Sequence, residues 1–456
     1  MKLKVVLSVL SCKITCAVLR AFKKGGTSLP GKIALLFCKD ILKYVSKNVK
    51  VILVTGTNGK TTTCRIIETA LEKAGINYFS NKSGANLLNG VVTSFCLASS
   101  LSGKNRHDYA VIECDEAALR QVTKYINPQV ILVTNIFADQ LDRYGDVFNI
   151  LRLIADGINN CDSATICINA DCSLCTHLMT LTEKEARLFG VDIEIPDTHI
   201  NEQNGILHCI KCGNPYTYDY VTYAHLGGFR CDNCGYRRHK PDVGAVSILN
   251  MDITGSDIIM SMNNRQYNLR VNLAGAHNIY NALAAACALN TVGMEDKHIL
   301  TAVSTFKSGF GRMEIIEINN IPVNIILVKN TAGFNQIINY LFLVENEYIL
   351  SVILNDKPAD GTDVSWINDV DFEKLNETSK KIKYVYLGGT RAGDMALRLK
   401  NAGFDMNKVY TVKNDKDLVN KALEHNIPIY ITATYTAMFN LRNMLTGKYS
   451  LKEFYK

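Results

Sequence analysis

The chain has 456 residues, of which 47% are hydrophobic and 20% are charged, and its formal net charge is +7. This composition is that of an ordinary folded protein and excludes a disordered one, and the length suggests about three domains. The charge is too small for this length to indicate nucleic-acid binding by itself. The 15 cysteines lie mostly as single residues inside apolar runs, which indicates reduced thiols in a cytoplasmic protein rather than a disulfide framework.

Residues 1–47 predict a helical segment ahead of the first domain. Five apolar residues recur at the spacing of one helix face: Leu3, Leu7, Leu10, Ile14 and Val18. Most basic residues lie off this face, so we predict an amphipathic helix that packs this face against the protein. The alternative is a helix that lies on a membrane surface. Lys13 interrupts the apolar run, which is too short for a membrane span and lacks a clear cleavage site for a signal peptide.

A phosphate-binding loop follows. Val49–Val54 predict a buried strand, TGTNGKTTT predicts a glycine turn, and a helix then runs to Gly75. In this arrangement backbone N–H groups and a helix N-terminus hold phosphate. We expect Lys60 to contact the β- and γ-phosphates of ATP and Thr61 to bind Mg²⁺. The candidate nucleotide-binding residues of the loop are Gly56, Thr57, Asn58, Gly59, Lys60, Thr61 and Thr62.

This loop resembles that of the Mur ligases and folylpolyglutamate synthases. These enzymes use ATP to convert a carboxylate into an acyl phosphate, which an amine then attacks. The resemblance implies that Glu113 in YAVIECDEAALR binds Mg²⁺. It also implies that Asn135 in VILVTN, Asn281 in AHNIYNALAAACAL and Arg312 in GFGRMEII lie at the nucleotide. One departure is Gln140, which stands where the family has histidine.

Four cysteines predict a zinc ribbon within residues 205–238: Cys209, Cys212, Cys231 and Cys234. The two C-x₂-C pairs are 18 residues apart, and four thiolates around Zn²⁺ leave no open position, so the predicted role is structural. A further pair, Cys172 and Cys175, has no second pair at ribbon spacing and is interpreted as two ordinary cysteines. The basic and aromatic YRRHK stretch beside the ribbon suggests nucleic-acid binding as a rival role.

The ribbon, the early GGTSLPGKIAL stretch and LNDKPADGTDVSW together resemble the MurT family, the ligase subunits of lipid II isoglutaminyl synthases. The resemblance implies a heterodimer with a GatD-type glutamine amidotransferase, which has a cysteine nucleophile and a histidine base but lacks the acid that orients the histidine. A histidine base needs such a carboxylate. Matching to the family selects Asp363 as this catalytic acid, with Asp356 and Asp360 as alternatives. Asp356 and Asp360 fit a turn-capping role equally well.

The activity implied is ATP-dependent amidation of the α-carboxyl of D-glutamate in the lipid II stem peptide, which yields D-isoglutamine for peptidoglycan biosynthesis. The partner supplies ammonia from glutamine, and the carboxyl is activated as an acyl phosphate. We expect ATP, Mg²⁺ and Zn²⁺, no nucleic acid, and contact with the inner face of the plasma membrane only through lipid II. The alternatives are a stand-alone amino-acid ligase of the Mur or folylpolyglutamate type and a zinc-ribbon ATPase that binds nucleic acid.

The predicted fold is α/β, because strands and helices alternate along the chain. We expect a P-loop Mur ligase central domain at residues 48–305, interrupted by the ribbon, and a Rossmann-like α/β domain at residues 306–456. The GGTRAGD stretch within the second domain has no lysine, so we interpret it as a strand-to-helix turn rather than a second phosphate loop.

Overall fold

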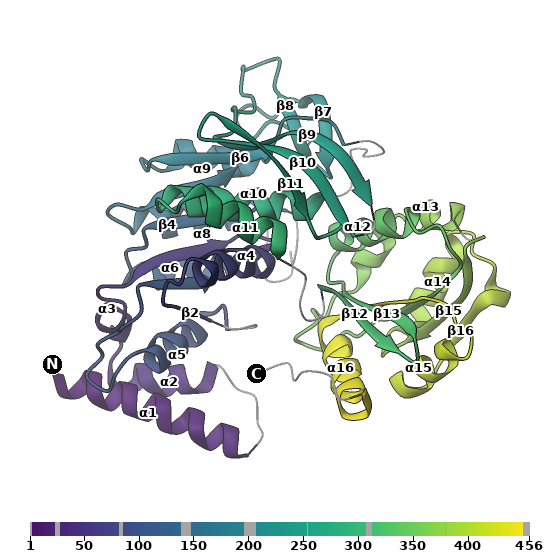
Figure 1. Ribbon diagram of the computed structural model, residues 1–456, viewed down its shortest axis with the longest axis horizontal. Coiled ribbons are helices and arrows are strands. Elements are labelled where there is room, and N and C mark those ends of the chain that lie inside the picture. Colours follow the sequence, from purple (N-terminus) through teal and green to yellow (C-terminus); the bar gives the residue numbers. More distant parts are fainter. Residues whose placement is uncertain are drawn as a thin grey trace. The chain divides into compact units, whose positions relative to one another are not determined.

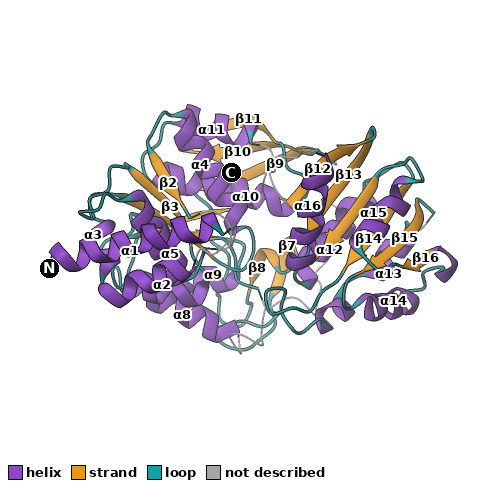
Figure 2. Cartoon of the chain, turned by 90° about the horizontal axis from the view of Figure 1, so that it is seen from below, coloured by secondary structure: helices purple, strands orange, loops and turns teal. Residues whose placement is uncertain are grey.

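The computed structural model describes residues 2–22, 28–81, 85–137, 147–195, 207–252, 254–306, 312–378 and 380–449. The chain forms two compact units. One comprises Met1–Met251 and Gly255–Phe306, and the other comprises Asp252–Thr254 and Lys307–Lys456. Each unit contains a sheet with helices packed on it (Figures 1 and 2).

The first unit is built on a sheet of nine described strands in the order β11-β10-β9-β6-β5-β4-β1-β3-β2. Its strands are β1 Lys50–Thr55, β2 Tyr78–Ser80, β3 Tyr109–Glu113, β4 Val130–Val133, β5 Thr165–Asn169, β6 Ala186–Val191, β9 Val243–Asp252, β10 Gly255–Met262 and β11 Arg265–Val271. The pairs from β2 to β9 are parallel, whereas β10 and β11 form an antiparallel hairpin. The central strands are continuous apolar runs because helices cover both faces of a parallel sheet.

The helices on this sheet are α4 Lys60–Lys73, α5 Leu88–Ala98, α6 Glu116–Val122, α8 Val147–Asn159, α9 Ser173–Leu181, α10 Ala276–Thr291 and α11 Asp296–Thr305. Helices α4, α10 and α11 pack together, and α5, α6, α8 and α9 form a second packed group. Helix α4 ends at Lys73 and is followed by Gly75 with φ of 67°, so the predicted helix stop is confirmed.

The helices that precede the sheet are α1 Lys2–Ala21, α2 Ser28–Phe37 and α3 Ile41–Val45. The predicted amphipathic helix is present as α1, but the prediction that its apolar stripe packs against the protein is wrong. Leu3, Ile14 and Val18 are 70%, 54% and 48% exposed. The buried face is the opposite one, which carries Val5, Ser8, Val9, Cys12 and Cys16.

The reason lies in the size of the side chains. Small and β-branched residues let α1 approach α2 and α5 closely, and the buried Ser8 hydroxyl donates to the Ala34 carbonyl at 2.8 Å. Helix α1 is apolar on both faces, so periodicity alone did not show which face is buried. In the described chain no helix is both long and apolar enough to cross a membrane.

The ribbon is inserted between β6 and β9 of the first sheet. It contains the antiparallel hairpin of β7 Thr217–Tyr223 and β8 Leu226–Arg230. Its own small core is formed by Tyr216, Phe229, Tyr236 and two of the cysteines, Cys209 and Cys231.

The second unit has a sheet of six described strands in the order β12-β13-β17-β14-β15-β16. They are β12 Arg312–Ile318, β13 Ile321–Leu327, β14 Tyr348–Ile353, β15 Ile382–Gly388, β16 Val409–Thr411 and β17 Ile429–Ala433. Only the pair β12–β13 is antiparallel among the described pairs. The helices are α12 Thr331–Phe342, α13 Phe372–Glu377, α14 Ala392–Asn401, α15 Asp415–Leu423 and α16 Tyr435–Tyr449, with short 3₁₀ helices at Ser365–Asp369 and Met406–Lys408.

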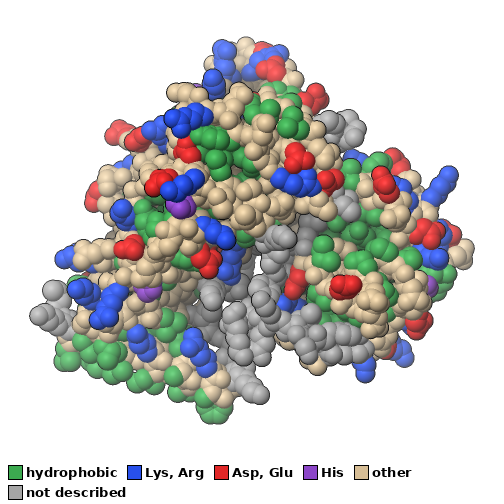
Figure 3. Space-filling view, in the orientation of Figure 1, with side chains coloured by type: hydrophobic (Ala, Val, Ile, Leu, Met, Phe, Trp, Pro, Cys, Tyr) green, Lys and Arg blue, Asp and Glu red, His purple; other side chains and the backbone are tan. Residues whose placement is uncertain are grey.

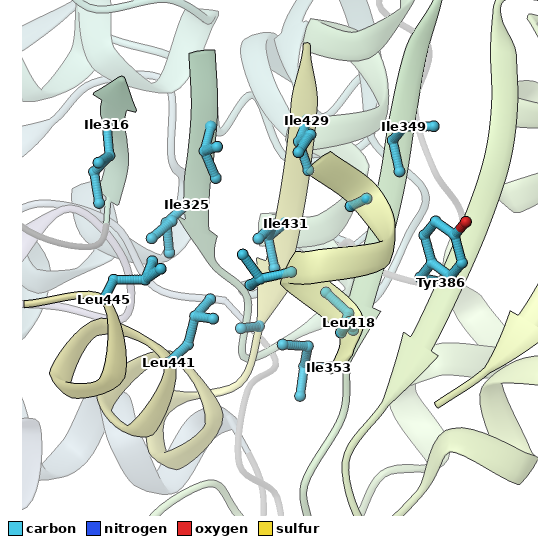
Figure 4. Close-up of a cluster of buried hydrophobic side chains, with 14 of the residues drawn as sticks. Ile316, Ile325, Ile349, Ile353, Tyr386, Leu418, Ile429, Ile431, Leu441 and Leu445 are labelled. Carbon is cyan, nitrogen blue, oxygen red and sulfur yellow. The ribbon is translucent and has the colours of Figure 1, made fainter. Parts of the chain in front are cut away.

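The core of the second unit lies between this sheet and its last helices. Figure 4 shows Ile429 and Ile431 of β17 facing Leu441 and Leu445 of α16, with Leu418 of α15 beside them. The GGTRAGD stretch forms the turn from β15 into α14, as predicted.

Candidate active site

The P-loop lies where the order of strands in the first sheet reverses. Strand β1 is paired with β3 on one side and β4 on the other, and the chain reaches β2 and β3 on one side before crossing to β4. Ligands bind beyond the carboxyl ends of the strands at such a switch point. Residues that follow β1, β3 and β4 are therefore brought to one place.

Two glycines allow the loop to fold tightly between its neighbours. Gly56 and Gly59 have φ values of 114° and 85°, which residues with a side chain rarely adopt. A Cβ at Gly56 would lie 2.5 Å from Thr134 Oγ1, and one at Gly59 would lie 2.1 Å from Asn281 Oδ1. These glycines are required both by backbone conformation and by the close approach of other segments.

Asn135, two residues after β4, holds the loop in place. Its Oδ1 accepts from the Asn58 N–H at 2.9 Å, and its Nδ2 donates to the Asn58 carbonyl at 3.1 Å. The Asn135 carbonyl accepts from the Thr57 N–H at 2.9 Å. The Thr57 hydroxyl accepts from the Phe137 N–H at 3.0 Å. The loop is thus held in shape by the end of the adjacent strand.

Thr61 and Glu113 form an oxygen-donor pair at the start of α4. The Thr61 hydroxyl donates to Glu113 Oε2 at 2.7 Å, and Glu113 is 9% exposed. Asn81 fixes the backbone of Glu113, because its side chain accepts from the Glu113 N–H at 2.8 Å and donates to the Glu113 carbonyl at 2.6 Å. A hydroxyl and a carboxylate are the donors that Mg²⁺ prefers, so these two residues fit such an ion.

Lys60 lies among carboxylates. Its Nζ donates to the Gly56 carbonyl and lies 3.3 Å from Glu116 Oε1. Burial favours the neutral amine, but the charges of Glu116, Glu113 and Asp115 outweigh it and raise the pKa of Lys60 above its ordinary value. The ammonium is therefore firmly charged and is positioned at the loop before any anion arrives.

Asn281 projects from α10 onto the first turn of α4. It is buried, its Oδ1 accepts from the Thr63 hydroxyl at 3.5 Å, and its Nδ2 donates to Asn278 Oδ1 at 3.0 Å. Its described contacts are thus with the loop and its helix, and contact with adenine stays a prediction. Thr62 is the third residue of α4 and is partly exposed.

The side chains of two residues singled out in the sequence lie outside the described part of the chain. Arg312 begins β12, but its side chain lies outside the described part of the chain, as does the whole of Gln140.

The four predicted zinc ligands come together. Their sulfur atoms lie within 4.8 Å of one another, and Cys209–Cys234 and Cys212–Cys231 are each 3.5 Å apart. Ligands at a tetrahedral Zn²⁺ are separated by about 3.8 Å when each Zn–S bond is about 2.3 Å. The two halves match: Gly213 N–H donates to the Cys209 carbonyl at 2.8 Å, and Gly235 N–H donates to the Cys231 carbonyl at 3.0 Å. The sulfur set fits a single tetrahedral ion.

The YRRHK stretch joins the ribbon to the sheet. The Tyr236 hydroxyl donates to the Ser173 carbonyl at 2.7 Å. Arg238 pairs with Asp171 at 2.5 Å and with Asp192 at 2.7 Å. These two side chains are engaged inside the first unit, which removes them from any nucleic-acid surface.

Cys172 and Cys175, the other C-x₂-C pair, are both buried. Cys172 Sγ lies 3.9 Å from His225 Nε2. Among the described residues, neither belongs to a cluster of metal-ligand type.

In the second unit, the three aspartates after β14 have different surroundings. Asp360 accepts from the Thr436 N–H and hydroxyl, both at 2.6 Å, and so holds the start of α16. Asp356 accepts from the Thr390 hydroxyl at 2.8 Å and lies 3.8 Å from Arg391. Asp363 is exposed, and its Oδ1 accepts from the Ser365 N–H at 2.8 Å. That N–H lowers the pKa of Asp363 below its ordinary value, so the carboxylate is charged and faces solvent.

Sequence reasoning missed Glu116, Asn81 and Asp171. Glu116 had a local signal, because it begins α6 just after Glu113, which ends β3, and Asp115. The partners of Asn81 and Asp171 could not be predicted, since they lie 32 and up to 109 residues away in the chain.

Comparison with known proteins defines the class. The model of the Mur ligase middle domain matches residues 54–211, and that of the MurT ligase C-terminal domain matches residues 327–438. The fold is similar to that of a pseudomurein peptide ligase type C from Methanothermus fervidus, with a TM-score of 0.66, 20% identity, and coverage of 89% of this chain and 80% of that one. It is also similar to the MurF ligase of Thermotoga maritima in complex with ADP, with a TM-score of 0.61, 14% identity, and coverage of 91% and 84%. The chain thus has the Mur ligase fold, which confirms the predicted fold class.

The relationship extends to the full length of one curated protein. The chain is 35% identical over 455 residues to the lipid II isoglutaminyl synthase (glutamine-hydrolyzing) subunit MurT of Streptococcus pneumoniae, and the match covers 98% of each chain. The chain therefore belongs to the MurT family, and the predicted resemblance is confirmed.

Proposed function

We propose that this chain is the ATP-dependent ligase subunit of a lipid II isoglutaminyl synthase. The observation that carries the proposal is the P-loop, in which Lys60 is held charged beside the Thr61–Glu113 pair, in a chain of the MurT family. This site suits transfer of the γ-phosphoryl group of ATP to a carboxylate, because that transfer depends mainly on positioning and charge neutralisation.

The proposed reaction has three steps. The partner subunit hydrolyses glutamine to glutamate and ammonia. The α-carboxylate of D-glutamate in the lipid II stem peptide attacks the γ-phosphorus of ATP and forms an acyl phosphate, and ADP leaves. Ammonia then attacks the acyl carbon, and inorganic phosphate leaves to give the amide. Activation is needed because a carboxylate is a poor electrophile and an oxide ion is a very poor leaving group.

Each residue at the nucleotide has a distinct role in this proposal. The N–H groups of residues 59–62 bind phosphate oxygens, because those of Thr57 and Asn58 already donate to Asn135. Lys60 neutralises the β- and γ-phosphates, and Thr61 and Glu113 hold Mg²⁺. Asn135 and Asn281 keep the loop in shape. A role for Arg312 at the nucleotide is proposed from the family resemblance alone. When bound, Mg²⁺ supplies additional positive charge at the transferred group.

We assign Zn²⁺ to Cys209, Cys212, Cys231 and Cys234 as a structural ion. The support is the sulfur-only donor set and the matched backbone turns around it. Through Tyr236 and Arg238 the ribbon reaches Asp171, whose Oδ2 also accepts from the Val191 N–H at 2.7 Å and from the Tyr280 hydroxyl at 2.5 Å. The ion therefore steadies the junction of α9, β6 and α10.

We further propose that Asp363 completes the catalytic triad of a GatD-type glutaminase. Asp360 is already engaged with α16, and Asp356 with Thr390. Asp363 is charged and exposed, which suits an acid that must accept an N–H from a histidine of another protein. In this proposal the chain meets the inner face of the plasma membrane where its lipid substrate lies.

Reconstitution tests the function against its rivals. The chain is purified alone and with its co-expressed amidotransferase, and ATP hydrolysis is measured with lipid II and glutamine. We expect glutamine-dependent turnover and an amidated stem peptide by mass spectrometry only with both subunits. Turnover of the isolated chain with a free amino acid would indicate a stand-alone ligase. Salt-sensitive oligonucleotide binding without any response to lipid II would indicate the nucleic-acid alternative.

A further inference from the structure

The outer face of α1 is an apolar surface that the described protein leaves uncovered. We call it the α1 face, and its residues are Leu3, Leu7, Leu10, Ile14, Val18 and Phe22. Leu3 and Phe22, near its two ends, are 70% and 73% exposed, and Leu7 and Leu10 are 40% and 37% exposed. Helix α2, which packs beside α1, adds exposed Leu36 and Phe37. Figure 3 shows hydrophobic side chains gathered along the lower left edge, where Figure 1 places α1 and α2.

This face is mounted rigidly. The Ser8–Ala34 hydrogen bond ties α1 to α2. Gly31 of α2 lies so close to α5 that a Cβ there would be 1.8 Å from the Asn89 carbonyl oxygen. Lys13 donates to the Ser99 carbonyl at 2.6 Å, just beyond the end of α5. Helix α1 therefore presents its outer face as a fixed part of the first unit, and it does not need to detach to do so.

The segment that carries the α1 face is basic, and its first acidic residue is Asp40. Residues 1–39 contain no Asp or Glu and eight basic residues: Lys2, Lys4, Lys13, Arg20, Lys23, Lys24, Lys32 and Lys39. The whole chain has a formal net charge of +7, so the rest of it carries −1. The entire excess of positive charge lies in this one segment. Among the described residues, Lys4, Arg20 and Lys32 are exposed.

We infer that the α1 face docks on the surface of an anionic lipid bilayer. An apolar helix face bordered by basic side chains buries its apolar residues at the level of the headgroups while the cations meet anionic lipids. Protein interfaces are depleted in lysine, so the lysine-rich border favours a lipid surface over a second protein. The inference stands on α1 and α2 alone and goes beyond the proposed amidation.

Vesicle binding tests the inference. The full-length chain is mixed with vesicles of phosphatidylcholine and phosphatidylglycerol, or of phosphatidylcholine alone, without nucleotide, glutamine or lipid II. We expect binding to the anionic vesicles, little binding to the neutral ones, and weaker binding at high salt. Because no substrate is present, this result does not depend on the proposed reaction, and failure of either proposal leaves the other open to test.

Variants separate the two parts of the α1 face. Leu3→Gln/Ile14→Gln removes apolar contact, and Lys4→Gln/Arg20→Gln removes charge while sparing Lys13. We expect each pair to weaken binding to anionic vesicles about tenfold or more. The matched control is Leu249→Gln/Leu397→Gln, whose leucines are 58% and 59% exposed elsewhere, and it should bind as wild type does. Unchanged melting temperatures and unchanged turnover of a water-soluble, short-chain lipid II would show that the variants fold.

Equal vesicle binding by the wild type and both α1 variants would overturn the inference, as would no binding by the wild type. A third outcome would also overturn it: the α1 variants keep vesicle binding but no longer co-purify with the amidotransferase. In that case the α1 face would be a protein interface.

Discussion

The P-loop of the first unit and the aspartate loop of the second differ in how far each is complete within this chain. At the P-loop, Lys60, Thr61 and Glu113 are buried or partly buried. Thr61 donates to Glu113 of β3, and Lys60 donates to Glu116 of α6. In the aspartate loop, Asp363 is exposed and bonded within its own turn. Both loops follow strands of mainly parallel sheets. The difference suggests that one chain carries a preorganised site together with part of a site that another subunit completes.

The largest expected effect concerns the incomplete site. Asp363→Asn should lower the glutaminase activity of the complex about a thousandfold or more, because the amide cannot hold the histidine in the required tautomer. Ammonia release from glutamine measures this. The matched control is Asp369→Asn, an exposed aspartate six residues away, which should retain activity. Equal glutaminase activity in the two variants would reject the role of Asp363 and the contrast between the two loops.

The next effect concerns the preorganised site. Lys60→Met should lower ATP-dependent amidation about a hundredfold or more, since it removes a fixed cation from the transferred phosphoryl group. Lys73→Met, at the exposed end of the same helix, is the control. Because glutaminase chemistry is assigned to the partner subunit together with Asp363, amidation with externally added ammonia should be impaired as strongly as amidation with glutamine. Normal turnover with ammonia would reject the role of Lys60.

Removal of the zinc ligand Cys231 should have a moderate effect. Cys231→Ser should abolish bound zinc and lower the melting temperature by roughly 5–10 °C, because the ribbon no longer positions Tyr236 and Arg238. Cys161→Ser, a buried single cysteine, should keep its zinc by elemental analysis. Full zinc content in the Cys231 variant would show that the metal lies elsewhere.

The smallest effect separates the cost of backbone strain from the cost of a steric clash at the P-loop. Gly59→Ala and Gly75→Ala both place a side chain at positive φ, but a Cβ at Gly75 has nothing within 4 Å, whereas one at Gly59 meets Asn281. Gly75→Ala should cost about 1 kcal/mol of unfolding free energy with unchanged ATP affinity. Gly59→Ala should also weaken ATP binding about tenfold, measured by calorimetry. Adding Asn281→Ala should restore part of that affinity. If the affinity is not restored, the loss comes from backbone strain at residue 59 alone.

The sequence predicted much of the preorganised site because its parts have local signatures. A β-branched strand, a glycine turn and a helix stop are close in sequence, as are the paired cysteines. It did not reveal Asn81 or Asp171, because their contacts join residues from distant segments. It misassigned the buried face of α1, since both faces are apolar and only packing against α2 and α5 separates them. The aspartate loop was found through family resemblance, because three carboxylates in one turn look alike until their partners are known.

The most direct test of acyl phosphate formation traces an oxygen atom from the substrate carboxyl to inorganic phosphate. Lipid II with a heavy oxygen isotope at both oxygens of the α-carboxyl of D-glutamate is incubated with the chain, its amidotransferase, ATP, Mg²⁺ and glutamine. If the carboxylate is phosphorylated before ammonia attacks, each turnover transfers one labelled oxygen to the released inorganic phosphate, and mass spectrometry detects it. Amide formation with unlabelled phosphate would contradict the account.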